Sequence, residues 1–315
     1  RPELTLSSFY GKRLNSAIAI ELSFSDEKRV RYDISAQQPE NIYSAWETEI
    51  TYSLGHSMWI KVNGKGDMQE DEEVLKVLRV TERYKEELEF VSRFLIYSLN
   101  TSALRGLVQE SAESPLGIYG EGLDVLINHL GEDELCLLKE IAHQGVAWME
   151  DIFCDREDLY RLGGYKLGRS MSRLYFQDKY MQKKNSFFSA ENVNEGALYL
   201  LFYLTLFISR QTPSFFAIDN IETGLNPRLC RFLMKQLAML AAENQKQALI
   251  TTHNPAILDG LNLNDDSQRL FVVSRKDDGQ TKVERVRLKP QKEGEHFLLS
   301  ELWQRGFLGG LPDNF

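Results

Sequence analysis

The sequence contains little cysteine. Only three of its 315 residues are cysteines, namely Cys136, Cys154 and Cys230. None of them belongs to a CxxC pair or lies at a zinc-binding spacing from a histidine. An odd number of scattered cysteines is typical of a reduced protein and not of a disulfide-stapled secreted one. The sequence therefore predicts a cytoplasmic protein and excludes a small disulfide scaffold.

Long apolar runs are also missing. No window approaches the ~18 consecutive apolar residues that a membrane span needs, and the most apolar run, residues 197–208, suits a buried helix. The chain opens Arg1-Pro2-Glu3, without the basic-then-apolar pattern of a signal peptide. No internal repeat or low-complexity tract is present. These absences predict a globular protein with no contact to a membrane.

Positive charge is in deficit. The chain has 37 Lys and Arg against 46 Asp and Glu, which gives a formal net charge of −9. A broad, nonspecific nucleic-acid surface needs a basic face, so the net charge does not indicate DNA as a partner. A local basic cluster is left open, with a solvated surface as its ordinary alternative. Its members are Lys166, Arg169, Arg173, Lys179, Lys183 and Lys184.

The hydrophobic pattern of the first half of the chain changes once, from the alternation typical of strands to the spacing typical of helices. Residues 17–34 alternate apolar and polar around a turn and predict a β-hairpin, and residues 49–64 predict further strands. From residue 69 the apolar residues recur at helical spacing, which predicts a long amphipathic helix over 74–95. Further helices are expected at 123–129 and 134–151, so this middle region is helical and acidic.

The second half alternates between strands and helices. A strand at 172–180 and a very apolar helix from 195 are expected first. The later pattern is a strand at 214–219, a helix at 227–244, a strand at 247–251, a short helix at 255–261 and strands at 270–274 and 282–288. Strand–helix–strand alternation predicts a parallel α/β sheet.

Two neighbouring strands end in polar residues. In "FFAIDNIETGLNP" (215–227) Asp219 closes a buried strand, and in "LITTHNP" His253 follows the next strand. Ligands bind parallel α/β sheets at the carboxyl ends of the strands. An acid there can hold Mg²⁺, which bridges nucleotide phosphates, and a histidine can contact the terminal phosphate or orient water. A turn-forming aspartate or a loop histidine is the commoner interpretation of either residue alone. Their joint order and strand context favour a nucleotide site.

These segments resemble the Walker B, D-loop and switch-histidine segments of ABC-type ATPases. The resemblance lies in the branch shared by SMC-like, RecF-like and overcoming-lysogenization-defect ATPases, which includes AAA-family ATPase subunits of bacterial anti-phage systems such as Septu and PARIS. "ENVNEGALYLLFYL" (191–204) stands where the family carries its signature motif, and "ELWQRGFLGGLPDNF" (301–315) is similar to the family's tail.

The resemblance covers residues 165–315 and implies an architecture. It implies an α/β, ABC-ATPase-like fold with a β-rich N-terminal lobe at 1–68, a helical insertion or lid at 69–164 and a C-terminal ATPase lobe at 165–315. The implied cofactors are ATP and Mg²⁺.

The resemblance also implies roles at matching positions. Asp219 would hold the metal, Asn220 occupies the catalytic-base position, Glu222 is the second acid of the run, and His253 is the switch histidine. Gly224 and Asn226 would belong to the D-loop, which crosses a dimer interface. Asn194, Glu195 and Gly196 would present backbone N–H groups to the γ-phosphate of the partner's ATP, a task that suits a helix N-terminus.

Three departures from the family pattern matter. Asn220 replaces the usual glutamate, and an amide is no base at neutral pH, where general-base help is worth ~10²–10⁴-fold in rate. Asn194 replaces the signature serine. No G-x-x-x-x-G-K-[ST] phosphate loop occurs, since "NGKGD" (63–67) is too short. In the family this loop would lie upstream of Arg1; the alternative is a pseudo-ATPase that has none.

The resulting expectation is an ATP-binding protein with slow or absent hydrolysis. It would form a homodimer or higher oligomer around ATP and gate an effector nuclease or toxin in anti-phage defence. The alternatives are an active SMC- or RecF-like ATPase in DNA repair or processing and a structural protein that binds no nucleotide.

Overall fold

The chain divides into two units, Arg1–Ser92 and Arg93–Phe315. In this computed structural model the described residues are 18–23, 28–36, 46–54 and 59–65 in the first unit. In the second unit they are 93–108, 115–157, 159–162, 172–181, 186–276, 279–288 and 298–309. The predicted lobes at 1–68, 69–164 and 165–315 remain a prediction. Most of the long helix expected over 74–95 lies outside the described residues.

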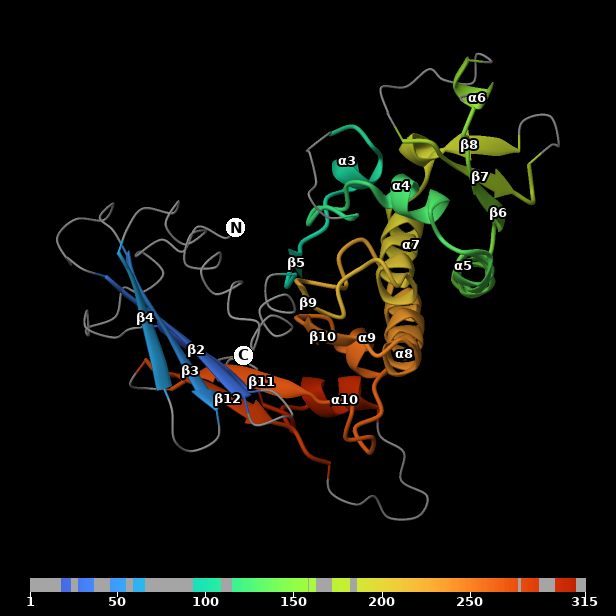
Figure 1. Cartoon of the computed structure of the whole chain (residues 1–315). Coiled ribbons are helices and arrows are strands. Elements are labelled where there is room, and N and C mark those ends of the chain that lie inside the picture. Colours follow the sequence, from blue (N-terminus) through green and yellow to red (C-terminus); the bar gives the residue numbers. More distant parts are fainter. Residues whose placement is uncertain are drawn as a thin grey trace. The chain divides into compact units, whose positions relative to one another are not determined.

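The first unit contains a four-stranded antiparallel sheet in the order β1-β2-β3-β4 (Figure 1). Its strands are Ile18–Ser23, Lys28–Ala36, Trp46–Leu54 and Trp59–Lys65. Ile20 pairs with Tyr32, and Tyr32 pairs with Ile50, so the alternating apolar positions of neighbouring strands stay in register. The expected hairpin and the strands after it are confirmed.

A three-stranded parallel sheet lies in the second unit. Strand β9 (Phe215–Ile218) runs between β10 (Gln247–Ile250) and β5 (Ile96–Tyr97), parallel to both. The expected parallel α/β arrangement is thus confirmed for β9 and β10.

Strand β5 corrects the end of the helix expected over 74–95. Phe94 and Leu95 fit the helical spacing, but the chain is extended here and pairs with β9. Tyr97 is fully buried, with its ring edge-on to Phe202 and Phe216. Pairing with β9 and burial of this ring override the local helical pattern.

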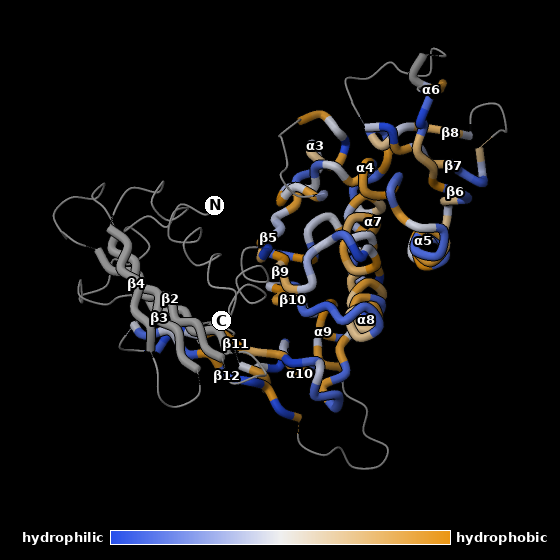
Figure 2. Tube along the Cα trace, in the orientation of Figure 1, coloured by the Kyte–Doolittle hydropathy of each residue, from blue (hydrophilic) through white to orange (hydrophobic). Residues whose placement is uncertain are grey.

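Helix α7 (Glu195–Ile208) is the centre of the core. Every residue from 197 to 208 is buried, and a helix that is apolar all round is stable only when surrounded. It appears as a mostly orange segment between paler neighbours in Figure 2. It contacts α3 (Thr101–Leu104), α4 (Leu123–Asn128), α5 (Glu132–Gly145) and α8 (Pro227–Glu243). The apolar helix expected from residue 195 is confirmed.

The surrounding helices are short except for two. Helix α8 (Pro227–Glu243) starts with proline in its first turn, as expected, and buries Leu233 and Leu237. Helix α5 (Glu132–Gly145) ends earlier than the predicted residue 151. At Gly145 the helix lies so close to α7 that an added Cβ would be 2.7 Å from Leu200. The chain then continues into strand β6 (Met149–Cys154). The remaining helices are α3 (Thr101–Leu104), α4 (Leu123–Asn128), α6 (Leu159–Leu162), α9 (Pro255–Leu258) and α10 (Leu299–Gln304).

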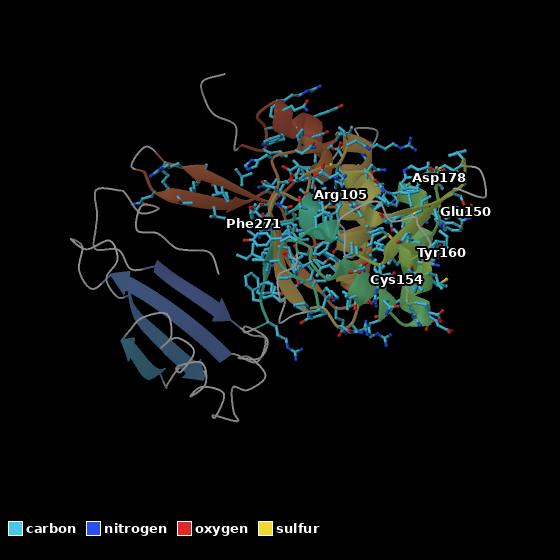
Figure 3. The ribbon with its side chains drawn as sticks, turned by 90° about the horizontal axis from the view of Figure 1, so that it is seen from above. Arg105, Glu150, Cys154, Tyr160, Asp178 and Phe271 are labelled. Carbon is cyan, nitrogen blue, oxygen red and sulfur yellow. The ribbon has the colours of Figure 1, made fainter. Side chains whose placement is uncertain are left out.

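A second sheet in this unit is antiparallel and rich in aromatic residues. It consists of β6 (Met149–Cys154), β7 (Leu174–Asp178) and β8 (Phe187–Ser189), and the 3₁₀ turn η4 (Ala190–Asn192) leads from it to α7. The Phe153 and Tyr175 rings stack at 5.8 Å. Figure 3 shows Glu150, Cys154, Tyr160 and Asp178 gathered at this end of the unit, far from Phe271.

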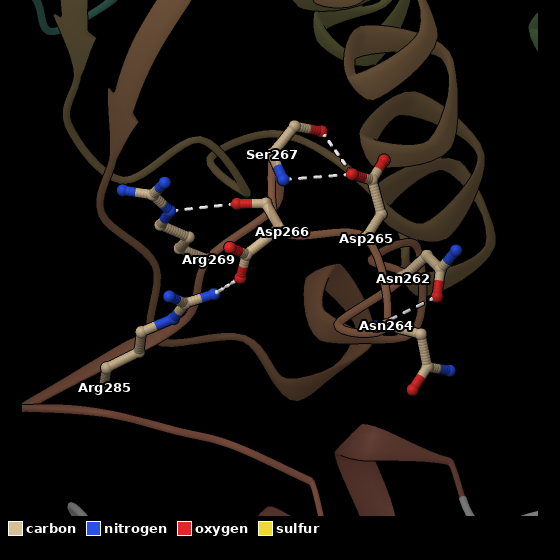
Figure 4. Close-up of polar contacts among 7 residues, drawn as sticks. All are labelled: Asn262, Asn264, Asp265, Asp266, Ser267, Arg269 and Arg285. Atoms are coloured by element: carbon tan, nitrogen blue, oxygen red, sulfur yellow. Dashed lines mark hydrogen bonds and ion pairs between the residues drawn. The ribbon is translucent and has the colours of Figure 1, made fainter.

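The last strands form the hairpin of β11 (Phe271–Arg275) and β12 (Thr281–Arg285). The loop before it is held by local polar contacts, among them the Asp266–Arg285 ion pair shown in Figure 4. Helix α10 is fixed to α9 because Ser300 donates both its N–H and its hydroxyl to the Asp259 carboxylate.

The C-terminal end of α7 is closed by a lysine from another element. The Lys246 ammonium donates to the carbonyl oxygens of Ser209, Thr212 and Pro213 at 2.7–3.3 Å and to the Thr212 hydroxyl. Burial lowers the pKa of Lys246 to about 8. This cation satisfies the carbonyl of Ser209, the C-cap residue of α7, and two carbonyls of the loop that follows.

All three cysteines are free. Cys136 is exposed on α5, Cys154 is half-buried and Cys230 is fully buried. Burial raises the pKa of the Cys154 thiol to about 12 and that of the Cys230 thiol to about 11. Among the described residues, no helix has both the length and the apolar character to cross a membrane.

Candidate functional site

Asp219 and Thr251 lie side by side where two parallel strands end. Ile218 of β9 pairs with Ile250 of β10, so the next residue of each strand emerges at the same edge. The Thr251 hydroxyl donates to Asp219 Oδ1 at 2.6 Å and accepts the backbone N–H of Asn220 at 2.9 Å. Thr251 is a site residue that the sequence reasoning missed. Its position directly after the neighbouring strand was the signal that could have found it.

Hydrogen bonds continue past the strand ends and join residues 219–222 to residues 251–253. Besides the two bonds of the Thr251 hydroxyl, Ile221 N–H donates to the Thr251 carbonyl at 3.2 Å. His253 N–H donates to Glu222 Oε1 at 2.9 Å. Side chains therefore extend the pairing of β9 and β10 by several residues. This ladder brings together Asp219, Asn220, Glu222 and His253 as the sequence predicts.

Asn220 has a left-handed backbone conformation with φ of 50°. Asparagine adopts this conformation several-fold more readily than most residues, and a longer side chain there costs roughly 1–2 kcal/mol. The Asn220 carbonyl accepts hydrogen bonds from the Thr223 N–H and hydroxyl at 3.0 and 2.9 Å. Asparagine at position 220 thus suits the left-handed backbone, and it places an amide where the resembling ATPases have glutamate.

One oxygen of the Glu222 carboxylate is shielded from solvent. This oxygen, Oε2, has no hydrogen-bond partner among the described residues. Burial raises the pKa of the Cys230 thiol, and the negative charge of Glu222 adds to the rise. Burial likewise raises the pKa of the Tyr203 phenol, with smaller contributions from Tyr199 and Glu222. Glu222 therefore lies near side chains of α7 and α8.

The N-terminus of α7 packs against the turn that follows β9. Gly224 has φ of 71°, and a Cβ added there would lie 2.9 Å from Glu195 Cγ. A Cβ on Gly196 would lie 3.1 Å from the Gly224 carbonyl oxygen. The structure therefore brings Glu195, Gly196 and Gly224 into contact within one chain. The Glu195 carboxylate also accepts the hydroxyl hydrogen of Thr101 at the start of α3.

Two of the predicted site asparagines are helix caps. Asn194 Oδ1 accepts the Ala197 N–H at 2.9 Å at the start of α7. Asn226 Oδ1 accepts the Leu229 N–H at 3.0 Å at the start of α8. Asparagine is among the best N-cap residues, so Asn194 performs a task that the family's serine could also perform. The Asn226 oxygen is committed to α8.

The His253 side chain is exposed, and its ring makes no hydrogen bond to any described residue. The loop that carries it is fixed through the backbone at Glu222. On the other side, Asn254 caps α9 by accepting the Ala256 N–H at 2.9 Å. The backbone at His253 is therefore fixed at the strand ends, and the exposed ring is available to an external ligand.

The donor set fits Mg²⁺ only together with phosphate. No group of three or more His, Cys, Asp and Glu in the described part of the chain is arranged to hold a metal by itself. Mg²⁺ is commonly held by one or two carboxylates plus phosphate oxygens and water. Each oxygen of the Asp219 carboxylate accepts one hydrogen bond, from Thr251 at 2.6 Å and from the Asn220 amide at 3.4 Å. Further acceptor positions on this carboxylate remain.

The basic cluster that the sequence leaves open, with a solvated surface as its ordinary alternative, falls mostly outside the described residues. Only Arg173 and Lys179, on either side of β7, are described. The Arg173 N–H donates to Asp124, and the Lys179 ammonium lies 5.0 Å from the centre of the Tyr180 ring. A joint basic surface of the six residues remains a prediction.

Comparisons with solved structures find weak similarity to SMC heads. The SMC head domain from Thermotoga maritima is 11% identical, with a TM-score of 0.37, and the match covers 83% of this chain and 75% of that one. The SmcHead bound to the C-winged helix domain of ScpA is 12% identical, with a TM-score of 0.42 and coverage of 90% and 83%. The Pyrococcus furiosus Smc head is 10% identical, with a TM-score of 0.40 and coverage of 84% and 79%.

The sequence matches no curated protein. One family model does match, over residues 175–259, and its description is "AAA domain, putative AbiEii toxin, Type IV TA system". The matched residues include α7, β9, α8 and β10, and with them Asp219, Asn220, Glu222 and His253. Over this part, the chain is therefore similar to an AAA-type ATPase domain.

Proposed function

We propose that the chain binds ATP with Mg²⁺ at the carboxyl ends of β9 and β10 and hydrolyses it slowly or not at all. The observation that carries the proposal is the Asp219–Thr251 pair at this edge, with Asn220 beside it where the resembling ATPases have glutamate. The match of this segment to an AAA domain supports the nucleotide as the ligand.

Each residue of the rim has a separate task under this proposal. Bound Mg²⁺ would neutralise charge on the nucleotide phosphates. Asp219 would hold the ion, and the Thr251 hydroxyl fixes the orientation of that carboxylate through their 2.6 Å hydrogen bond. The exposed His253 ring would donate to the terminal phosphate. A hydrogen bond to a charged group is worth ~1.5–3 kcal/mol, so His253 would help to distinguish ATP from ADP.

Slow turnover follows from the missing base. The Asn220 amide cannot accept a proton from water at neutral pH, and such help is worth ~10²–10⁴-fold. The nearby Glu222 uses one oxygen for the His253 N–H and buries the other. The proposal is therefore a site that holds ATP rather than one that turns it over quickly.

ATP would also join two copies of the chain. The N-terminus of α7, with Asn194 exposed at its start, would face the γ-phosphate bound by the second copy. The contact between Gly224 and Glu195 would make this helix end and the turn after β9 one surface. Binding of one phosphate by both copies favours the dimer if the affinity for ATP is higher in that state.

The identity of the partner is the most specific part of the proposal. We place an effector nuclease or toxin under the control of this ATP-bound dimer, in defence against phage. The support is the resemblance of the motifs to anti-phage ATPase subunits and the toxin named in the description of the matching family. Co-purification of the natural complex with and without Mg²⁺ and ATP tests this part separately.

The test of the main proposal measures nucleotide binding and phosphate release by the full natural protein. We expect wild type to bind Mg²⁺·ATP and to release little phosphate. Asp219→Ala should lower the affinity at least tenfold, while Asn220→Glu should release phosphate faster despite some backbone strain at φ 50°. Asn220→Gln, which has the length of glutamate but no basic group, is the matched control for strain. Brisk release by wild type, or an affinity that Asp219→Ala leaves unchanged, would contradict the proposal.

A further inference from the structure

We infer that Glu222 is a positioning residue that fixes the loop carrying His253, and that it is not a substitute base for Asn220. The inference rests on the proposed function, since it concerns how that site recognises the terminal phosphate. Glu222 would then hold the His253 loop, a task separate from the general-base role that the resembling ATPases assign to glutamate at position 220.

The first support is the contact itself. Glu222 Oε1 accepts the backbone N–H of His253 at 2.9 Å, and the two residues are 31 positions apart in the chain. Only Asn254 lies between His253 and α9, and it caps that helix. His253 is therefore held from two sides, by Glu222 before it and by the helix cap after it.

The second support is the burial of the other oxygen. Glu222 Oε2 is buried, and within the described parts of the chain it has no donor. The carboxylate is close enough to Cys230 and Tyr203 to contribute to the raised pKa of both. Cys230 and Tyr203 belong to α8 and α7 and are themselves buried. A general base must reach a water that attacks the phosphate, and this oxygen is shielded from solvent.

The third support is the connection to the rest of the rim. The Glu222 carbonyl accepts the Leu225 N–H at 3.0 Å, which closes the turn that contains Gly224. Gly224 in turn lies against Glu195 at the start of α7. The residue that holds the His253 loop thus belongs to the same turn that contacts α7. A contiguous series of contacts joins the two parts that the proposed site uses on the terminal phosphate.

The experiment compares Glu222→Gln with Glu222→Ala in the full protein. Glutamine keeps an oxygen for the His253 N–H but cannot act as a base, whereas alanine removes both. Glu243→Gln, an exposed charge at the end of α8, is the matched control for the loss of one negative charge. Unchanged amide exchange within α7 establishes that each variant is folded.

Two measurements decide the outcome. Amide hydrogen exchange at His253 without nucleotide should accelerate about tenfold or more in the alanine variant, the size expected for loss of one hydrogen bond, and should stay within threefold in the glutamine variant. The ratio of ATP to ADP affinity should fall roughly tenfold in the alanine variant, with ADP affinity unchanged, and should be retained with glutamine. A general loss of structure would lower both affinities alike.

The inference is overturned if alanine leaves both the exchange and the affinity ratio unchanged. It is also overturned if glutamine abolishes the residual phosphate release while nucleotide affinity and exchange stay as in wild type, because that is the result for a base. Failure of the proposed function looks different: wild type then binds neither nucleotide. The exchange rate at His253 in that case still decides whether Glu222 holds the loop.

Discussion

The two ends of helix α7 are completed in different ways. At its N-terminal end the cap comes from the helix's own Asn194, which is exposed. At its C-terminal end the cap comes from Lys246, which is distant in sequence and donates to buried oxygens of residues 209–213. The C-terminal end is therefore fixed by the fold. The N-terminal end is capped by its own exposed Asn194, and Glu195 in its first turn contacts Thr101 and the turn that contains Gly224.

Truncation of a buried side chain in the middle of α7 should lower stability more than removal of either cap. Phe202 is fully buried and lies edge-on to Tyr97 and Tyr203. We expect Phe202→Ala to lower the free energy of unfolding by about 3–5 kcal/mol, because it removes apolar contacts and leaves a cavity. Urea denaturation measures this. A loss below about 1 kcal/mol would mean that α7 is not the core element described.

Removal of the C-terminal cap should have the next largest effect. Lys246→Met keeps the length of the side chain but leaves several buried oxygens without their donor. We expect a loss of about 1–3 kcal/mol in the free energy of unfolding, reduced by the relief of burying a charge. Nucleotide affinity should not change, since this end of the helix lies away from the rim. Parallel urea and nucleotide titrations check both statements, and a change in ATP affinity would contradict the separation of the two ends.

Removal of the N-terminal cap should be milder for stability. Asn194→Ala should cost about 1 kcal/mol, because the Ala197 N–H loses its acceptor, and Asn194→Ser should restore most of it. Unlike Lys246→Met, this variant should weaken ATP-dependent dimer formation, which analytical ultracentrifugation measures. If Asn194→Ala, like Lys246→Met, leaves the dimer unchanged, the N-terminal end has no role in phosphate binding.

The last prediction is a pH dependence that belongs to Lys246. Burial lowers its pKa in the folded protein to about 8 from its ordinary 10.5. Between these values the unfolded chain binds a proton that the folded chain lacks, so this group makes the protein more stable as the pH rises from about 8 to 10.5. Below about pH 8 both forms are protonated and the contribution is flat. Unfolding of wild type relative to Lys246→Met across this range should show the rise, and a difference independent of pH would refute it.

The sequence predicted those elements whose signal is local. The very apolar helix from residue 195, the proline at the first turn of α8 and the alternation of β9, α8 and β10 follow from period and capping rules, and the structure has them all. Strand β5 could not be predicted this way. Its two residues, Ile96 and Tyr97, directly follow the apolar positions of the predicted helix, and they form a strand because β9 lies beside them.

The same distinction holds at the rim. Asp219 and His253 could be paired from the sequence because each follows a strand and parallel strands end at one edge. The left-handed backbone of Asn220 and the position of the Glu222 carboxylate depend on contacts with residues 31 positions away. Those contacts are tertiary, so no local pattern encodes them. The absence of glutamate at position 220 is visible in the sequence, but the left-handed backbone that favours asparagine there is not.

The scarcity of cysteine gives the chain a practical property. Labelling reagents react with thiolates, and the raised pKa values of Cys154 and Cys230 keep both thiols protonated, while Cys230 is buried and Cys154 half-buried. Cys136 on α5 is the exposed one. A spin label or dye added to the unmodified protein would therefore attach at one position in each chain. When two chains assemble, the sample would contain a single label pair, and one interlabel distance would report their association without any mutation.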